Sequence, residues 1–452
     1  MDSGSSQQHI NKFGSSFGVL VTLAGSAVGL GNIWRFPYLV GENGGAAFII
    51  IYLISVLLIG IPILLTEFVI GRSSQTNAVN AFKVLAPGSK WYLVGVLGVL
   101  TSFLILCFYS VVGGWSLGYL FKACALQFSP EAANGDFESM FGNFISSPWI
   151  SISLHFLFMA ATATVVAMGV NKGIEMFSKI LMPMLFVLMV FIAVRSLTMD
   201  GAGEGIDYLF KPDFSKVTGR TVLAAIGQSF FSLSLGMGIV LTYASYVSKS
   251  ENILKCSVIT AVSDTMFAII AGCAIMPAVF AYGLDPGEGA GLVFVTLPYI
   301  FTNMPFGSIL AIFFFVCLLI AALTSSISLL EVVISFVVDH FSLSRRKAVA
   351  ISFSAFFLIG AAASLSLGQW DWLKIGGKSL FDFLDYVTSN YMMTVASVFF
   401  VIFLGWKMGH KVFKDEVTND GTLHVPEWII ELLFFLIRYL APVMLAVIIF
   451  IK

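Results

Sequence analysis

Three carboxylic acids lie inside long apolar runs of the 452-residue chain, namely Glu67, Asp264 and Glu331. An acid at the centre of a membrane helix costs roughly 2.5–3.5 kcal/mol on insertion scales, so each needs a partner and is a functional candidate by default. For Glu67 the favoured interpretation is structural, as an acceptor for the amides freed by a break in the first helix. Asp264 follows Ser263, and we favour a functional role for it, whereas Glu331 has no evident partner in the sequence.

Two short segments carry glycines and hydroxyl side chains where an uninterrupted helix would carry Leu or Ile. Residues 25–32 read GSAVGLGN, and residues 231–238, about half the chain away, read FSLSLGMG. Interrupted helices at corresponding positions of two halves point to a transporter binding site at the bilayer midplane, where freed carbonyls hold cations and helix N-termini face a carboxylate. Each segment alone is equally consistent with a packing seam of small residues. The matched pair favours the binding site.

A run of three hydroxyl residues, Thr324 to Ser326, lies deep in another apolar stretch. Hydroxyl and bared carbonyl oxygens bind Na⁺ without burying net negative charge. The alternative is that these hydroxyls bond back to the carbonyl four residues earlier in their own helix. By itself the run favours this alternative, so the cation site depends on the other two signals.

The elements that must position these residues are membrane-spanning helices. The chain is 58% apolar and only 11% charged, with a mean hydropathy of +0.95, whereas soluble domains carry roughly 25% charged residues. A spanning helix needs about 20 mostly apolar residues, and eleven such runs occur. They lie near 17–39, 46–70, 92–122, 149–169, 174–197, 221–248, 255–283, 307–339, 348–367, 379–405 and 427–451. The sequence predicts an all-α membrane protein with eleven transmembrane helices.

Charge and metal-ligand patterns exclude several other classes. The excess of Lys and Arg in alternate loops places the N-terminus in the cytoplasm, and eleven spans then put Lys452 outside. A net charge of -1 gives no indication of a nucleic-acid partner. The five cysteines form no CxxC pair and the five histidines are scattered, so neither a metal centre nor a catalytic cluster is predicted.

Residues 24–38, AGSAVGLGNIWRFPY, followed by ENGGA at 42–46, resemble the neurotransmitter:sodium symporter family. The resemblance covers nearly the whole chain, and the GMG of residues 236–238 is similar to the bacterial branch that carries hydrophobic amino acids. It implies a five-plus-five inverted repeat with broken helices 1 and 6. The implied organisation is a cytoplasmic tail (1–16), a transporter core (17–405, with repeats at about 17–197 and 221–405), and a cytoplasmic loop with the eleventh helix (406–452).

The resemblance also implies two Na⁺ sites. The ligands implied for the first Na⁺ are the Ala27 carbonyl, the side chains of Asn32, Ser232 and Asp264, and the carboxylate of the substrate. The ligands implied for the second Na⁺ are the carbonyls of Gly25, Val28 and Ala321 with the hydroxyls of Thr324 and Ser325.

For an amino acid substrate the resemblance implies three groups of contacts. The carboxylate would meet the amides of Leu30 and Gly31 and the hydroxyl of Tyr109. The ammonium would face the carbonyls of Ala27, Phe231 and Ser232, with Ser234 nearby. The side chain would lie in a pocket lined by Ile105, Tyr109, Phe231, Met237, Ser328 and Leu329. These pocket residues are mostly apolar or aromatic, which argues against a charged substrate side chain.

Two gates are implied, one on each side of the membrane. Arg35 and Asp385 resemble the extracellular pair, which we expect to close through water. Asp339 matches the acid of the cytoplasmic gate, but Ile10 and Phe13 stand where the family has Arg and Trp. We therefore interpret Lys12 as a substitute, with Tyr246 assisting. The run from Gly173 to Pro183 is similar to the family's element for unwinding helix 5.

The predicted function is Na⁺-coupled import of hydrophobic and aromatic amino acids, of the Leu, Trp and Tyr class, by alternating access across the cell's plasma membrane. Animal members of the family need Cl⁻ because their first Na⁺ site lacks a fixed negative charge. Asp264 supplies that charge here, so chloride independence is predicted, with proton counter-transport by Asp264 as an option. H⁺ coupling through Asp264 or Glu67, and a transport-silent amino acid receptor, are the alternatives. A monomer is expected to be sufficient for transport.

Overall fold

The computed structural model describes residues 13–129, 131, 135–284 and 289–451. Within this part of the chain, nine helices are long and apolar enough to cross a membrane. They are Ala46–Ser74 (α3 Ala46–Ser55, η2 Val56–Gly60, α4 Ile61–Ser74), Tyr92–Cys124 (α6), Pro148–Ala167 (α8), Val170–Leu197 (η4 Val170–Glu175, α9 Met176–Leu197), Ile253–Ala281 (α13), Gly307–Phe341 (α16), Arg345–Leu365 (α17), Leu380–Thr418 (α18 Leu380–Val387, η7 Thr388–Met392, α19 Met393–Ile402, η8 Phe403–Met408, α20 Gly409–Thr418) and Glu427–Phe450 (α21 Glu427–Phe435, η9 Leu436–Leu440, α22 Ala441–Ile451).

Two predicted spans are interrupted. The first consists of α1 (Ser16–Ala27) followed by Gly31–Glu42 (η1 Gly31–Arg35, α2 Phe36–Glu42), and the two parts bend by 54°. Counting this bent pair as one gives ten spans in the described chain. The predicted sixth span falls on α11 (Gly219–Ser232) and α12 (Ile239–Ser245), which have 14 and 7 residues. Since neither part is long enough to cross alone, the count of eleven stays a prediction.

Short elements join the spans. They are α5 (Ala78–Leu85), α7 (Phe137–Ser146), α10 (Ala202–Phe210), η5 (Phe214–Lys216), α14 (Gly289–Gly291), η6 (Leu292–Thr296), α15 (Leu297–Asn303) and an antiparallel hairpin of β1 (Lys374–Ile375) with β2 (Lys378–Ser379). The predicted all-α membrane fold is therefore confirmed, with one small hairpin added. These loop helices were not predicted, because an apolar run of spanning length is a signal of membrane helices only.

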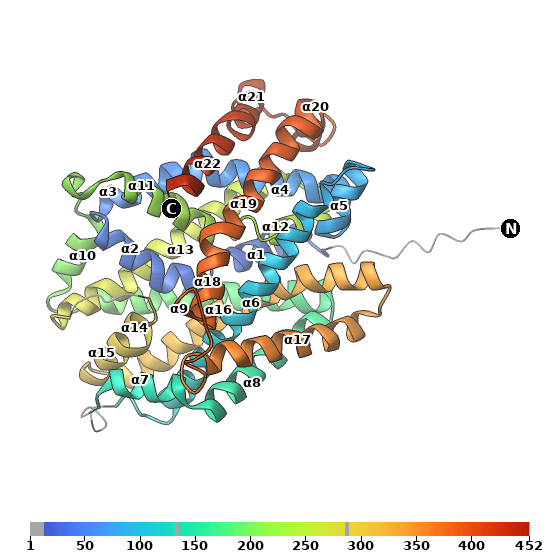
Figure 1. Ribbon diagram of the computed structural model, residues 1–452. Coiled ribbons are helices and arrows are strands. Elements are labelled where there is room, and N and C mark those ends of the chain that lie inside the picture. The colour runs from blue at the N-terminus through green and yellow to red at the C-terminus, as the bar shows by residue number, and fades with distance from the viewer. Residues whose placement is uncertain (1–12, 130, 132–134, 285–288, 452) are drawn as a thin grey trace.

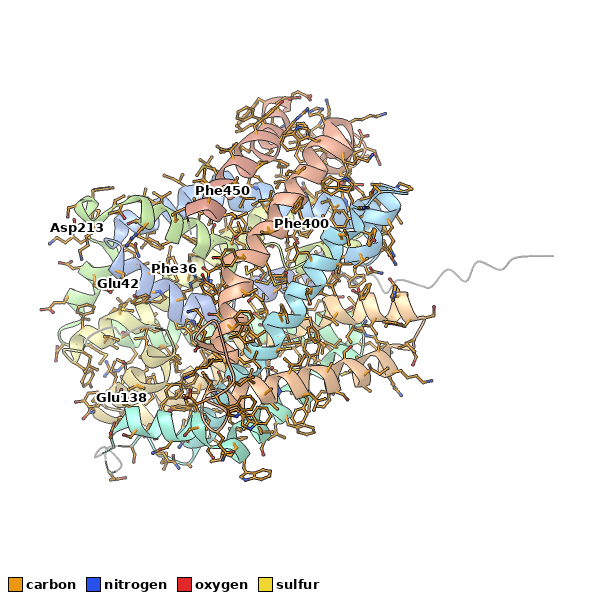
Figure 2. All side chains as sticks on the ribbon, in the orientation of Figure 1. Phe36, Glu42, Glu138, Asp213, Phe400 and Phe450 are labelled. Carbon is orange, nitrogen blue, oxygen red and sulfur yellow. The ribbon has the colours of Figure 1, made fainter. Side chains whose placement is uncertain are left out.

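The interrupted helices lie in the middle of the bundle. Figure 1 shows α1 and α12 near its centre, and α1 contacts α9, α13 and α16. Figure 2 shows Glu42, Glu138 and Asp213 at one edge of the molecule, away from α5. These three acids therefore lie at one edge of the bundle, whereas α1 and α12 lie near its centre.

The first break is made by a change of backbone direction at Val28, whose ψ of 107° is extended rather than helical. Two glycines that follow Val28 let other helices approach. A Cβ on Gly29 would lie 2.8 Å from the Ser325 hydroxyl, and one on Gly31 would lie 2.6 Å from the Phe231 ring. The glycines of this motif therefore place helix 1 against α16 and the end of α11 at van der Waals distance.

The second break occupies the six residues between α11 and α12. Ser234, Gly236 and Gly238 have φ angles of 55°, 74° and 73°, in the left-handed region where a side chain is strained. The Ser234 hydroxyl donates to the Ser26 carbonyl at 2.8 Å, which ties this break to the first one. Both interruptions predicted from the sequence are therefore present, and they touch each other.

Glu67 serves the break in the sixth helix. Its buried carboxylate accepts the Gly236 amide at 2.8 Å and the Leu241 amide at 3.3 Å. The expectation that Glu67 binds amides of helix 1 is wrong, although the structural role as an acceptor is present. The reason is that α4 packs directly against α12, which brings Glu67 to the other broken helix.

Replacing Glu67 should destabilise the fold through these two amides. Glu67→Ala leaves two buried N–H groups without an acceptor, at roughly 1–3 kcal/mol each, so the thermal unfolding midpoint of the purified protein should fall. Glu67→Gln keeps one acceptor oxygen and should lose less. Thr66→Val is the matched control, because the Thr66 hydroxyl bonds only to the Pro62 carbonyl of its own helix. Equal midpoints for Glu67→Ala and Thr66→Val would contradict this role.

Candidate functional site

A small cavity lies where the two breaks meet. The space that the centre of a water molecule can reach inside it is about 30 Å³. It is lined by Ser26, Ala27, Gly29, Leu30, Gly31, Asn32, Ile105, Tyr109, Phe231, Ser232, Ser234, Met237, Ile239, Ser325 and Leu329. Ten of the eleven residues predicted to bind substrate are in this set. Ser26, Gly29 and Ile239 were not predicted; Ser26 and Gly29 each adjoin a predicted residue, and Ile239 lies two residues after Met237.

Ser328 is the predicted pocket residue that does not line the cavity. Its hydroxyl donates to the Thr324 carbonyl at 3.0 Å and accepts the Tyr243 hydroxyl at 2.9 Å. On α16, Ser325 and Leu329 are four residues apart and share the face that lines the cavity. Ser328 lies beside this face and packs toward α12.

The groups implied for the substrate carboxylate come together at the first break. The Leu30 amide points at the Tyr109 hydroxyl, with 3.4 Å between the nitrogen and the oxygen. The Gln228 side chain donates to the Gly31 carbonyl at 3.3 Å and so links the two broken helices. An N–H at the start of a helical segment and a phenol hydroxyl can both donate to a carboxylate.

The residues implied for the first Na⁺ converge beside the cavity. The Asn32 amide nitrogen donates to Ser232 Oγ at 2.9 Å and to Asp264 Oδ1 at 2.7 Å. The Ser232 hydroxyl donates to Asp264 Oδ2 at 2.6 Å. One residue from each of three helices therefore contributes oxygen atoms to a single cluster. The N–H groups of Asn32 satisfy the same oxygens that a bound cation would take.

Tyr52 is a member of this cluster that the sequence analysis did not find. Its hydroxyl donates to Asp264 Oδ2 at 3.3 Å, and its ring packs edge-on against Phe36 at 5.1 Å. Tyr52 lies in an apolar run with no polar neighbour, so its sequence context predicts only a core aromatic. Every partner of the Asp264 carboxylate in the described chain is neutral.

The hydroxyls implied for the second Na⁺ face the first break from α16. A Cβ on Gly25 would lie 3.5 Å from Thr324 Cβ, so the two residues face each other with room for no more than a methyl group between them. The Thr324 hydroxyl donates to the Ile320 carbonyl at 3.0 Å and to the Ala321 carbonyl at 3.2 Å. Thr324 therefore makes the intrahelical bond named as the alternative in the sequence analysis, while still facing helix 1. Val28 has the extended backbone that frees carbonyl groups nearby.

The predicted extracellular gate pair is not in direct contact. No ion pair joins Arg35 to Asp385 within the described residues, and the Arg35 guanidinium lies over the Phe231 ring, 5.1 Å from its centre. Asp385 accepts the Ser389 hydroxyl at 2.9 Å. This arrangement is compatible with the predicted closure through water. It also puts the Arg35 guanidinium over a ring that lines the cavity.

The cytoplasmic gate differs from the prediction. Asp339 accepts the Asn77 amide at 2.6 Å, and Tyr246 donates to Glu331 at 2.8 Å rather than to Asp339. Lys12 lies outside the described residues. The implied grouping of Asp339 with Tyr246 is therefore not formed, because the two residues have other partners.

Glu331, left open by the sequence, has a full set of partners. Both of its carboxylate oxygens accept from the Arg345 guanidinium, and the Tyr246 hydroxyl is a third donor. Arg345 also donates to the Val166 carbonyl at 2.7 Å. This pair was not predicted, because nothing in the sequence shows that the start of α17 folds back onto α16.

The start of α1 is held by Glu175, a buried acid that the sequence analysis passed over. Its carboxylate accepts the Gly14 amide at 2.7 Å and the Ser15 hydroxyl at 3.1 Å, and pairs with Lys179 at 2.7 Å. A Cβ on Gly18 would lie 2.0 Å from a Glu175 carboxylate oxygen, so this glycine makes the room for the carboxylate. Glu175 ends η4, inside the Gly173 to Pro183 run predicted to unwind.

Two broken helices that meet at a cavity inside a bundle of membrane spans, with a buried cluster of side-chain oxygens on one side, are typical of a secondary transporter. The chain matches the model of the sodium:neurotransmitter symporter family over residues 11–140 and 146–452, and it belongs to this family. The family resemblance seen in the sequence is confirmed.

Relatives and solved structures agree with this assignment. An uncharacterized sodium-dependent transporter of Bacillus subtilis, YhdH, is 38% identical over 98% of each chain. A second, from Haemophilus influenzae, is 38% identical over 95% of each chain. The crystal structure of MhsT in complex with L-phenylalanine is 44% identical, with a TM-score of 0.89 over 97% of this chain and 99% of that one. The chain is therefore a multi-pass, sodium-dependent transporter and not an enzyme.

Removing the charge of Glu175 should loosen the start of α1. A hydrogen bond to a charged group contributes roughly 1.5–3 kcal/mol, and every 1.4 kcal/mol is about tenfold in an equilibrium constant. In Glu175→Gln, hydrogen exchange at the Gly14, Gly18 and Val19 amides should therefore accelerate by about tenfold. The measurement is hydrogen–deuterium exchange of the purified protein read by mass spectrometry.

Lys179→Gln is the control for Glu175→Gln. It removes the half-exposed partner of Glu175 but leaves the carboxylate and its contacts with residues 14 and 15. Exchange at the start of α1 should therefore stay close to wild type. Unchanged exchange in Glu175→Gln, or equal acceleration in both variants, would show that the carboxylate does not hold this segment.

Proposed function

We propose that this protein is a Na⁺-coupled symporter that imports hydrophobic and aromatic amino acids of the Leu, Trp and Tyr class. The observation that carries the proposal is the oxygen cluster of Asn32, Ser232 and Asp264 at the edge of the cavity between the broken helices. A cation in that cluster would lie beside the substrate carboxylate, so each ligand would favour binding of the other. That reciprocity is the thermodynamic basis of symport.

An α-amino acid needs an anion site and a cation site a few Å apart. The Leu30 and Gly31 amides and the Tyr109 hydroxyl are the proposed donors to its carboxylate. Its ammonium is proposed to face the carbonyl of Ala27 on the first break, and the carbonyl of Phe231 with the polar groups of Ser232 and Ser234 on the second. The cavity lies between these two sets.

The remaining lining selects for apolar side chains. Ile105, Phe231, Met237 and Leu329 bring aliphatic and aromatic surface to the cavity, and no lining residue carries a charge. A charged substrate side chain would therefore be buried without a partner, which is costly. The bound ligand of the similar transporter MhsT, L-phenylalanine, is consistent with this choice. Met237 is unbranched and can adjust to side chains of different shape.

Two Na⁺ are proposed to bind with the substrate. The first takes Asn32, Ser232, Asp264, the Ala27 carbonyl and the substrate carboxylate. The proposed ligands of the second are the carbonyls of Gly25, Val28 and Ala321 with the hydroxyls of Thr324 and Ser325. The closeness of Gly25 to Thr324 supports this second site, since a cation there would join helix 1 to α16.

The proposed cycle alternates between two gates across the plasma membrane, with the N-terminus in the cytoplasm and the C-terminus outside. Arg35 and Asp385 close the outer side through water, which leaves the pair weak enough to open in each turn. On the inner side, we assign the restraint of α1 to Glu175 in place of Lys12. A monomer contains the complete proposed site.

Uptake by reconstituted protein tests the coupling. Proteoliposomes should accumulate radiolabelled Leu, Trp or Tyr when an inward Na⁺ gradient is imposed, and a K⁺ or pH gradient alone should not replace it. Accumulation driven by a pH gradient without Na⁺ would support H⁺ coupling instead. Saturable binding without uptake under any gradient would support a receptor.

The Asp264 carboxylate is proposed to replace chloride. Two Na⁺ and a zwitterion bring a net charge of about +2 into a site of low dielectric, where uncompensated charge is costly. Asp264 is fully buried and its described partners, Asn32, Ser232 and Tyr52, are all neutral. Its negative charge is therefore free to balance a cation. After Na⁺ leaves, a proton on Asp264 is the proposed compensation during the return step.

Wild-type uptake should proceed in chloride-free buffer. Asp264→Asn keeps the size of the side chain but removes its charge, so transport should be abolished or should come to depend on added Cl⁻. Ser263→Ala is a control one residue away, and it should keep chloride-independent uptake. A wild-type requirement for Cl⁻, or normal chloride-free transport by Asp264→Asn, would refute the proposed charge balance without refuting Na⁺ coupling.

A further inference from the structure

An open groove of about 470 Å³ lies at the start of α6, away from the transport cavity. It is lined by Ser89, Lys90, Trp91, Leu93, Val94, Leu97 and Phe399. The first three residues precede the helix, the next three belong to its first turns, and Phe399 belongs to α19. The groove therefore runs along two neighbouring spans from the point at which one of them begins.

The groove has one charged end and an apolar body. Lys90 supplies the single charge in the lining, and its ammonium has no hydrogen-bond or ion-pair partner among the residues that the structure describes. Lys83 lies nearby in sequence, over the Tyr92 ring at 5.7 Å. No acid lines the groove.

Aromatic packing gives the groove a fixed wall. The Trp91 ring packs edge-on against Phe403 at 5.1 Å and against Phe399 at 6.4 Å. The turn that holds Trp91 is tied down by Ser89, which donates to the Ala86 carbonyl at 2.7 Å. A wall held by two ring contacts and a bonded turn is formed before any ligand arrives, which lowers the entropy cost of binding.

The position of the groove relative to the membrane decides which kind of molecule can fill it. Leu93 and Phe399 are 52% and 41% exposed, and both belong to membrane-spanning segments, so the medium that they face is hydrocarbon. Lys, Trp and Tyr near the end of a span are typical of the membrane–water boundary. Lys90, Trp91 and Tyr92 therefore mark the level of the lipid headgroups, and the apolar body extends from there toward the acyl chains.

We propose that this groove binds one phospholipid with an anionic headgroup, its phosphate on Lys90 and one acyl chain against Leu93, Leu97 and Phe399. The charge of Lys90 is complementary to such a headgroup, and a zwitterionic lipid would bring a cation against it. By the loop charges of the sequence this is the cytoplasmic leaflet, where anionic lipids attract basic residues.

The opposite side of the first turns of α6 packs tightly inside the protein. A lipid bound in the groove therefore differs from the surrounding bilayer lipid in what it contacts. A Cβ on Gly95 would lie 2.3 Å from the Ala78 carbonyl, and one on Gly98 would lie 3.6 Å from Gly238. The first turns of α6 thus pack against α5 and against the second helix break without spare room. A lipid fixed on their outer side would restrain a helix that also carries Ile105 and Tyr109.

Lipid titration of the delipidated full-length protein tests the site. Native mass spectrometry in detergent should detect one phosphatidylglycerol bound more tightly than phosphatidylcholine. Lys90→Gln should weaken phosphatidylglycerol binding by about fivefold, the effect of one basic residue near an anionic surface, and leave phosphatidylcholine unchanged. Lys172→Gln, which removes an exposed lysine elsewhere, should stay within about twofold of wild type.

Leu97→Trp tests the acyl-chain part of the groove, since the larger ring fills it and should weaken both lipids. If this variant does not fold, Leu97→Phe serves the same purpose, and Lys90→Gln still tests the headgroup at an exposed position. Equal binding of the two lipids, an equal loss in Lys90→Gln and Lys172→Gln, or full lipid binding by the filled groove would overturn the proposal. So would competition by inorganic phosphate alone at the affinity of the lipid.

Discussion

A backbone N–H or C=O group that leaves a helix inside a membrane has no water to bond, and it must find a partner within the protein. This constraint accounts for the centre of the molecule. The break after α11 is possible because Glu67, from another span, accepts the amides of Gly236 and Leu241. The Ser234 hydroxyl then joins this break to helix 1 through the Ser26 carbonyl. The cavity and its polar lining exist where these satisfied breaks meet.

The same need for hydrogen-bond partners inside the protein shapes the proposed cation site. Asn32, Ser232, Asp264 and Tyr52 come from four different helical segments, and their polar atoms bond to one another in one buried cluster. A cation would exchange with N–H groups for the same oxygens, so its arrival would rearrange bonds without leaving an oxygen unpaired. Movement of helix 1 relative to α11 and α13 would thereby be coupled to occupancy of the cluster, as the proposed alternating access requires.

The end of the bundle predicted to face the cytoplasm has contacts that the family pattern did not lead us to expect. Asp339 is bonded to Asn77, while Glu331 gathers Arg345 and Tyr246. The start of α1 depends on Glu175 of the fifth span. Since Glu175 lies in the run predicted to unwind, loss of helical structure there would also release the beginning of helix 1. Restraint of helix 1 and the local stability of the fifth span are therefore linked through a single carboxylate.

Hydropathy and glycine placement act locally along the chain, so the sequence alone predicted the spans and the two interrupted helices, and most of the cavity lining followed from the family resemblance. It also singled out Glu67, Asp264 and Glu331, since a buried acid is costly wherever it lies. Only the tertiary structure decided their partners. Those of Glu67 are 169 and 174 residues away. The charged partner of Glu331 is Arg345, the first residue of the next span. Tyr52 was overlooked for the same physical reason: its hydroxyl has a role only because folding brings Asp264 to it.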